Sequence, residues 1–234
     1  MGTSASNSGG TGGAWTTFKR DASTFARLGG EDRAAKTLGS YVAALGGAAT
    51  AVAAAGAGIS TGQSLAALLA GSTGPTGVAG GLETVGLTHL LGADRFTILS
   101  DLLDRFAGAG SDLEAQAARN ALLDVLDELL PEDGDVPLET VRLDENQVIE
   151  TLQRYLIALI YNRAIPIIDE RLTRLQNPQL AQQRDQELRE YIAVLVRLST
   201  QNTTPLAIDW AGNDGHEFIE SMLRAVYDQL EEWE

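Results

Sequence analysis

Apolar residues recur every three to four positions through residues 83–234, the spacing that gathers them on one face of an α-helix. No convincing stretch of the chain alternates apolar and polar residues with a period of two, the pattern of a half-buried strand. We therefore predict an all-α fold, a multi-helix bundle. Three apolar stripes define its C-terminal helices: Val148, Leu152, Tyr155, Leu156, Leu159 and Ile160; Leu188, Tyr191, Ile192, Leu195 and Leu198; and Ile219, Met222, Leu223, Val226, Leu230 and Trp233.

Helix-end signals divide this region further. The segment Ser111–Glu114 is a capping box, predicted to open a helix that Pro131 ends. A second polar segment, Asp144–Gln147, is predicted to open a longer helix, which Pro166 should kink or end. Asn177 precedes a proline and provides the N-cap of the next helix.

Residues 14–36 combine aromatic and basic side chains at helical spacing. Lys19, Arg20 and Arg27 lie off the apolar face. We favour a short helix that its aromatic side chains hold on the core; a helix that contacts a membrane or a nucleotide is the alternative. The apolar face consists of Trp15, Phe18, Ala22, Phe25 and Leu28.

Residues 37–82 contain no charged side chain. Their many alanines favour helix, whereas each glycine disfavours it by about 1 kcal/mol. We predict short helices around 37–55 and 62–70, with breaks near Gly56–Gly58 and Gly71–Pro75.

The same uncharged stretch is long enough to cross a membrane, but it is rich in Ala, Gly, Ser and Thr rather than in strongly inserting residues. Small residues let helices approach closely, and Gly58 and Gly62 have the GxxxG spacing. We therefore expect this stretch to be buried against other helices or a protein partner.

The chain carries 17 basic and 32 acidic residues, a net charge of −15. The charge is uneven: +1 over residues 1–100 and −16 over residues 101–234. This balance argues against general attraction to nucleic acid or to an anionic membrane. The absence of cysteine excludes disulfides, iron–sulfur clusters, zinc fingers and thiol nucleophiles.

Two candidate catalytic patterns have simpler interpretations. The glycine-rich stretch 56–64 superficially resembles a phosphate-binding loop, but it lacks the lysine and a preceding strand. His216 lies beside Asp214 and Glu217 and near Ser221, a grouping more typical of a helix start than of a catalytic triad. An enzyme that uses His216 and nearby carboxylates is a rival hypothesis.

The metal-binding candidates are also weak. His89 lies in an apolar run and is predicted to be a core or interface histidine. The acidic segment 131–135 does not have the spacing of a calcium loop, and a solvated turn is predicted. The helical carboxylates lack the Glu-x-x-His pairing of a metal-binding bundle, so we expect a non-enzymatic chain without metal or cofactor. Those carboxylates are Asp101, Asp104, Asp124, Asp127 and Glu128.

Residues 2–13 hold only Gly, Ser, Thr, Asn and Ala, so we predict a disordered Gly/Ser-rich N-terminal tail over residues 1–13. Such a tail reaches about 19 Å. It lacks the basic and apolar regions of a secretory signal, and we expect a cytoplasmic protein. The other predicted domains are residues 14–82, an aromatic and basic helix plus uncharged helices, and residues 83–234, an acidic helical domain.

Gly2 follows Met1 and is small, so removal of the initiator methionine is expected to expose its α-amine. The reference pKa of this amine is about 8, which leaves a nucleophilic fraction at neutral pH. At the end of an uncharged tail, this amine can enter another enzyme's active site. The segment 1–6 also fits the permissive myristoylation pattern, although one acyl chain anchors only marginally. A terminus without such a role is the simpler alternative.

The start Met1–Ser4, the Gly/Ser tail, the aromatic and basic segment from Trp15 to Arg27, the Ala/Gly-rich middle and the acidic helical remainder together resemble the QatB family. QatB is a component of the four-gene Qat anti-phage defence cassettes of bacteria. The resemblance implies three partners encoded beside it: an ATPase, a QueC-like enzyme and a TatD-like nuclease.

QueC-type chemistry activates a 7-deazaguanine carboxylate with ATP and transfers it to an amine, which in related defence systems can be a protein's N-terminal glycine. The resemblance thus implies Gly2 as acceptor, with the ATPase docked on the uncharged middle or the acidic helices. A membrane-active effector that inserts residues 37–82 is the alternative. The candidate binding residues of the tail and the aromatic-basic helix are Thr3, Ser4, Trp15, Phe18, Lys19 and Arg20.

Overall fold

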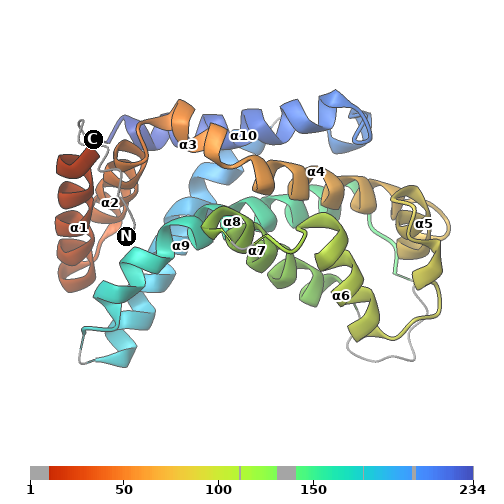
Figure 1. Ribbon diagram of the computed structural model, residues 1–234, viewed down its shortest axis with the longest axis horizontal. Helices are drawn as coiled ribbons and strands as arrows, with labels where there is room; N and C mark the ends of the chain where they lie inside the picture. The colour runs from red at the N-terminus through yellow and green to blue at the C-terminus, as the bar shows by residue number, and fades with distance from the viewer. Residues whose placement is uncertain (1–10, 111, 131–140, 176, 202–203, 234) are drawn as a thin grey trace, which may run out of the picture. The chain divides into compact units, whose positions relative to one another are not determined.

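Regular structure in this chain is helical throughout the part that the structure describes. The computed structural model describes residues 11–110, 112–130, 141–175, 177–201 and 204–233 (Figure 1). Within these ranges there are α-helices and short 3₁₀-helices but no strand, which confirms the all-α prediction. Contacts between Cα atoms divide the chain into two compact units. Three long helices contribute to both: α8 (Glu145–Leu172), α9 (Pro178–Thr200) and α10 (Asn213–Glu231).

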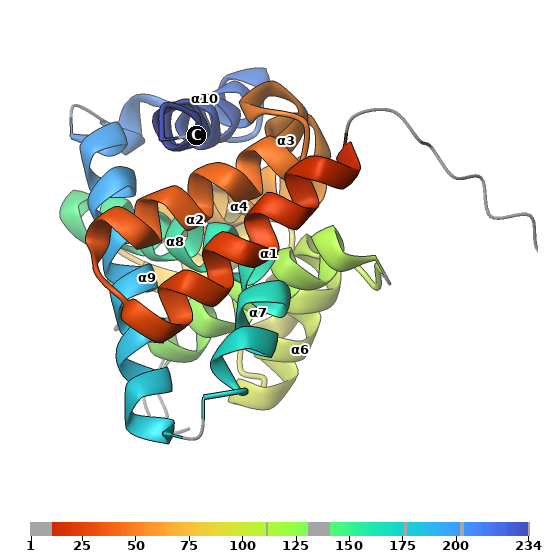
Figure 2. The ribbon, with the colours of Figure 1, turned by 90° about the vertical axis from the view of Figure 1, so that its left-hand side faces the viewer.

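The first unit contains α1 (Thr11–Leu28), α2 (Glu31–Ala44) and most of α3 (Ala48–Ala54), together with the ends of the long helices. Helices α1 and α2 lie side by side (Figure 2). Gly29 and Gly30 join them with φ angles of 62° and 95°, in the left-handed region that favours glycine. The unit comprises Met1–Ala53, Ala164–Tyr191 and Arg224–Glu234.

Helices α2 and α10 approach each other closely in this unit. A Cβ atom at Gly39 would lie 2.6 Å from the carbonyl oxygen of Leu230, so only glycine allows the two backbones this distance. The fully buried side chains of this unit include Phe18, Ala22, Phe25, Leu38, Val42, Tyr227 and Leu230.

The second unit comprises Ala54–Arg163 and Ile192–Leu223. Helix α4 packs against α5 and α7 and touches α6, so its uncharged residues form much of the core. The elements that lie wholly in the second unit are α4 (Gly56–Gly71), α5 (Gly77–Thr84), η1 (Thr88–Leu90), α6 (Arg95–Phe106), α7 (Leu113–Leu129) and η3 (Pro205–Ala207). Its fully buried side chains include Leu65, Leu68, Leu69, Leu82, Leu102, Leu122 and Tyr155.

The predicted breaks in the uncharged stretch are partly right. Helix α4 ends at Gly71, and α5 begins at Gly77, which confirms the break near residues 71–75. The break predicted near Gly56–Gly58 falls at Ala55, between the end of α3 at Ala54 and the start of α4 at Gly56; the prediction is wrong only in that α4 includes Gly58. Glycine costs less there than in a helix interior, since the first turn has no intrahelical N–H bonds to lose. A further break, which was not predicted, falls at Gly46 and Gly47, both at positive φ.

Most helix-end signals act as predicted. Asp144 and Gln147 form a reciprocal capping box: the Gln147 amide donates to Asp144 Oδ1 at 2.9 Å, and the Asp144 amide donates to Gln147 Oε1 at 2.8 Å. Asn177 Oδ1 accepts from the next helix's first amides. Pro166 lies inside α8 and does not end it.

Two helix starts differ from the predictions. Asp112 caps α7 by accepting from the amide of Ala115 at 2.8 Å, whereas the predicted cap, Ser111, lies outside the described residues. Helix α1 begins at Thr11, within the predicted tail of residues 1–13.

Candidate functional site

The three tail residues singled out from the sequence, Gly2, Thr3 and Ser4, lie outside the described residues. The described residues begin at Thr11, the first residue of α1. The candidate acceptor, Gly2, precedes the first residue of this helix by nine positions in the sequence.

Two candidate binding residues of α1, Trp15 and Phe18, belong to an aromatic cluster that joins α1 to α2. The ring centroids of Trp15 and Phe18 lie 5.9 Å apart, and Phe18 lies 5.3 Å from Tyr41. Phe18 is fully buried and Trp15 is half-buried. Edge-to-face contacts of this kind add about 0.5–1.5 kcal/mol each beyond area burial. The cluster supports the favoured interpretation, a helix docked by its aromatic side chains.

The two basic candidates of α1 face solvent. Lys19 and Arg20 are exposed, and Arg20 Nε donates to Oδ1 of the neighbouring Asp21 at 3.4 Å. A screened pair of this kind contributes little to stability. Both cations thus remain accessible on α1.

The GxxxG pair of α4 is a close-packing site. A Cβ at Gly58 would lie 2.6 Å from Leu159 Cδ2, and one at Gly62 would lie 2.8 Å from Tyr155 Cε1. Tyr155 Oη donates to the Gly58 carbonyl oxygen at 2.7 Å. Burial raises the pKa of Tyr155 well above its ordinary value, and the neighbouring Thr61 hydroxyl lowers it only partly. The two glycines let α8 lie against α4.

The uncharged stretch contributes to one candidate for a broken membrane span. No single helix among the described residues is long and apolar enough to cross a bilayer. Helices α2 and α3 pass the same test of length and composition as a pair, with a bend of 73° between them.

The structure excludes a core position for His89, one of its two predicted roles; the other, an interface histidine, stays a prediction. Its side chain is 61% exposed on η1, and its Nε2 lies 3.1 Å from Asp101 Oδ2. Within the apolar run 87–91, residues Thr88–Leu90 form one 3₁₀ turn; Leu87 and Leu90 are buried, whereas the histidine faces solvent.

No catalytic triad forms around His216 in the described part of the chain. The histidine lies half-buried in the first turns of α10. The Ser221 hydroxyl donates to the carbonyl oxygen of Phe218 in its own helix, at 2.8 Å. The described residues also contain no group of three or more acidic or histidine side chains that could hold a metal ion.

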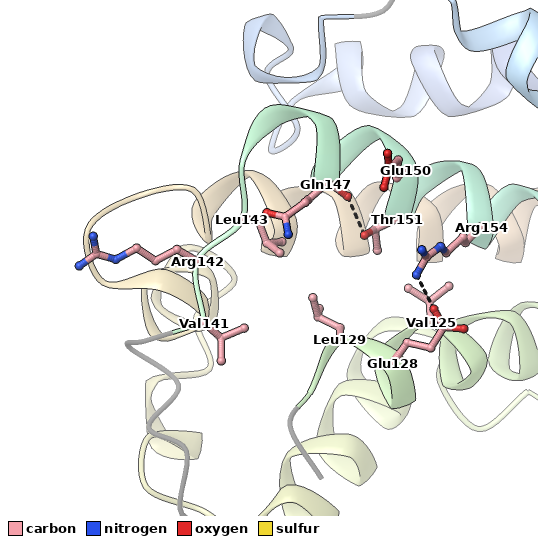
Figure 3. A pocket seen from close by; sticks show the side chains of 10 residues that line it. All are labelled: Val125, Glu128, Leu129, Val141, Arg142, Leu143, Gln147, Glu150, Thr151 and Arg154. Carbon is pink, nitrogen blue, oxygen red and sulfur yellow. Dashed lines mark hydrogen bonds and ion pairs between the residues drawn. The ribbon is translucent and has the colours of Figure 1, made fainter. Parts of the chain in front are cut away.

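A pocket of about 260 Å³ lies between the end of α7 and the start of α8 (Figure 3). Arg154 pairs with Glu128 across it, and the Thr151 hydroxyl donates to the Gln147 carbonyl at 2.7 Å. The lining carries two acidic and two basic side chains, so the pocket has no net charge, and we assign it no chemistry. No local motif marks these residues. The pocket is lined by Val125, Glu128, Leu129, Val141, Arg142, Leu143, Gln147, Glu150, Thr151 and Arg154.

Comparison with known proteins gives one family match. The family model described as QatB, Qat anti-phage system associated protein, matches residues 46–230, about four-fifths of the chain. The match runs from just before α3 to the penultimate residue of α10 and does not include the tail or α1. No curated protein and no solved structure matches this chain.

Proposed function

We propose that this chain, which the family match shows to be a member of the QatB family, serves the Qat anti-phage defence system as a non-catalytic modification acceptor. The acceptor is the α-amine of Gly2, the modifying enzyme is QueC-like, and the folded helices bind an ATPase. The family match carries the defence assignment. The sequence of residues 2–10 supports the acceptor role, since it places the amine on a neutral leader made only of small and polar residues.

The proposed step forms one amide bond. The Gly2 nitrogen attacks the carbonyl carbon of the ATP-activated 7-deazaguanine carboxylate. The activating group leaves with the bonding electrons, and the ammonium-derived proton goes to solvent or a base. The chain gains the mass of the carboxylic acid minus one water. Gly2 suits this attack because it has no side chain to hinder the approach.

Three features of the described residues support a non-catalytic role. The grouping around His216 makes no triad contact, since the Ser221 hydroxyl is directed to its own helix backbone. In the polar pocket at α7 and α8, Arg154 and Glu128 neutralise each other in an ion pair. The acidic helices offer instead a broad charged surface, which suits binding and steering of a partner more than chemistry.

Co-expression tests the proposal. The chain is produced with its Met1-Gly2 start, alone and together with the QueC-like protein of the same cassette, and the intact masses are compared. We expect a single adduct that depends on the partner, and its loss in Gly2→Pro, whose secondary amine is hindered. An Asn7→Ser variant is the matched control and should retain the adduct. An unchanged mass beside an active partner would contradict the acceptor role.

A second candidate function is a membrane-active effector that inserts residues 37–82. The bent pair of α2 and α3 is the observation that favours it. Two measurements distinguish this candidate from the acceptor: leakage of dye-filled anionic vesicles and toxicity in cells. A charge at Ala54, at the end of α3, should abolish both if insertion is the activity, and should leave the Gly2 adduct unaffected.

A further inference from the structure

A shallow apolar groove lies in the second unit, formed by α9, the η3 connection and α10. Its volume is about 480 Å³, within the range of ligand sites. Unlike the pocket of Figure 3, it has no charged side chain in its lining. The lining consists of Leu198, Ser199, Gln201, Thr204, Ile208, Phe218 and Met222. A groove of this composition suits apolar side chains rather than a charged small molecule.

Exposed apolar residues extend this surface. Leu198 belongs to the apolar stripe predicted from the sequence, yet it is 50% exposed. Val194, one helical turn earlier on α9, and Leu206 on η3 are each 46% exposed. Exposed leucines and valines gathered beside a groove are typical of a binding site.

The groove is preformed, because several contacts fix its floor. Trp210 is buried and stacks edge-to-face on Phe218, with ring centroids 5.5 Å apart. Its indole nitrogen donates to the Pro205 carbonyl oxygen at 2.8 Å. Gln63 Nε2 of α4 donates to the carbonyl oxygens of Trp210 and Gly212, at 3.0 and 2.9 Å. A partner therefore binds without first ordering this surface, which lowers the entropic cost.

Acidic residues stand close to lining residues of the groove in the sequence and form its inferred rim. Asp214 lies one turn before Phe218 and on the same side of α10, Glu217 precedes Phe218, and Asp209 follows Ile208; all three carboxylates are exposed. Over the segment 192–223 there are four acidic residues and one basic residue, Arg197. An apolar floor with this rim complements an amphipathic helix whose flanks are basic.

Charge also decides between other occupants. A second copy of the chain, with its net charge of −15, would bring a like-charged rim against this one. Residues 2–10 have no large apolar side chain to fill the groove. We infer that the groove of α9, η3 and α10 docks a basic amphipathic helix of another protein. This inference rests on the proposed function in one respect: it seeks the partner among the proteins encoded with this chain.

Binding of the full chain to each purified cassette protein tests the inference. Leu198→Gln removes an apolar contact without changing charge, and Leu123→Gln on α7 is the matched control, because Leu123 is 41% exposed and outside the groove. We expect one partner to bind, with an affinity that falls as salt rises. Leu198→Gln should weaken it about tenfold, and Leu123→Gln less than about twofold. Leu198→Lys should weaken it further, by repelling the basic flanks.

Hydrogen exchange provides a second readout that does not depend on any variant. The inference expects partner-dependent protection of amides in 194–201 and 218–222. It is overturned if no cassette protein binds, if Leu123→Gln and Leu198→Gln act equally, or if the groove instead mediates dimerisation that Leu198→Gln abolishes. The mass at Gly2 is measured separately, so failure of the groove and failure of the acceptor role remain distinguishable.

Discussion

The hydroxyl of Tyr155 on α8 donates a 2.7 Å hydrogen bond to the carbonyl oxygen of Gly58 on α4. The bond is possible because neither Gly58 nor Gly62 carries a side chain that would hold the two helices apart. It fixes the uncharged middle of the chain against α8, inside the part that the family model matches. Four predictions about the fold and its charges follow, and a fifth concerns the tail.

Replacing Tyr155 with phenylalanine should remove this hydrogen bond and keep the ring. We expect the free energy of unfolding at neutral pH to fall by about 1 kcal/mol, the usual net value of one buried bond. Urea unfolding followed by circular dichroism measures it. An unchanged unfolding midpoint would show that the bond contributes nothing.

The same residue predicts a pH dependence. Burial raises the pKa of Tyr155, so the folded chain keeps its phenol neutral where the unfolded chain ionises. The stabilisation is therefore complete below about pH 10, the ordinary tyrosine pKa, and is lost as pH rises above it. Melting temperatures between pH 8 and pH 11 check this. The difference between the wild-type chain and Tyr155→Phe should shrink above pH 10; a constant difference would contradict the assignment.

Gly62→Ala should destabilise the second unit. The new Cβ would lie 2.8 Å from the Tyr155 ring and 3.3 Å from Ile219, and overpacking of this kind costs about 1–3 kcal/mol. The better helix propensity of alanine offsets about 1 kcal/mol of that at most. Gly56→Ala is the control, because its Cβ would meet nothing within 4 Å. Thermal melts should rank Gly62→Ala below wild type and Gly56→Ala at or above it.

The ion pair between Arg163 and Glu114 provides the fourth test. Arg163 Nε and Nη2 contact the Glu114 carboxylate at 2.6 and 3.0 Å, and the arginine side chain is 1% exposed. Glu114→Ala leaves a buried charge without this carboxylate and should cost about 2–3 kcal/mol. Glu128→Ala breaks a pair whose partners are both more than half exposed, and should cost less than about 1 kcal/mol. Equal losses in chemical denaturation would contradict this ranking.

Helix content and several helix ends could be predicted because their causes are local. Asp144 and Gln147 needed only each other to form a capping box. His89 could not be placed, since a buried run and a single exposed 3₁₀ turn have the same short pattern. The exposure of Leu198 could not be predicted either, because helical periodicity identifies an apolar face but not whether another element covers it.

The two compact units could not be predicted from the sequence, because each combines segments far apart along the chain. The groove likewise depends on contacts that the sequence pattern does not show. Trp210 packs on Phe218, and Gln63 bonds to residues about 150 positions away in the chain. For the family, the sequence resemblance depended most on Met1–Ser4, whereas the matched residues begin at position 46. The helices and the tail thus provide separate support for the assignment.

The mass of the N-terminal peptide from cells that carry the whole defence cassette is the most direct test of the acceptor role. Tandem mass spectrometry locates any added group on the Gly2 nitrogen or elsewhere, with cells that lack the QueC-like gene as control. We predict an amide-linked 7-deazaguanine acyl group on Gly2 that is absent from the control cells. An unmodified glycine in cells that resist phage, or the same group on Lys19 instead, would contradict the account.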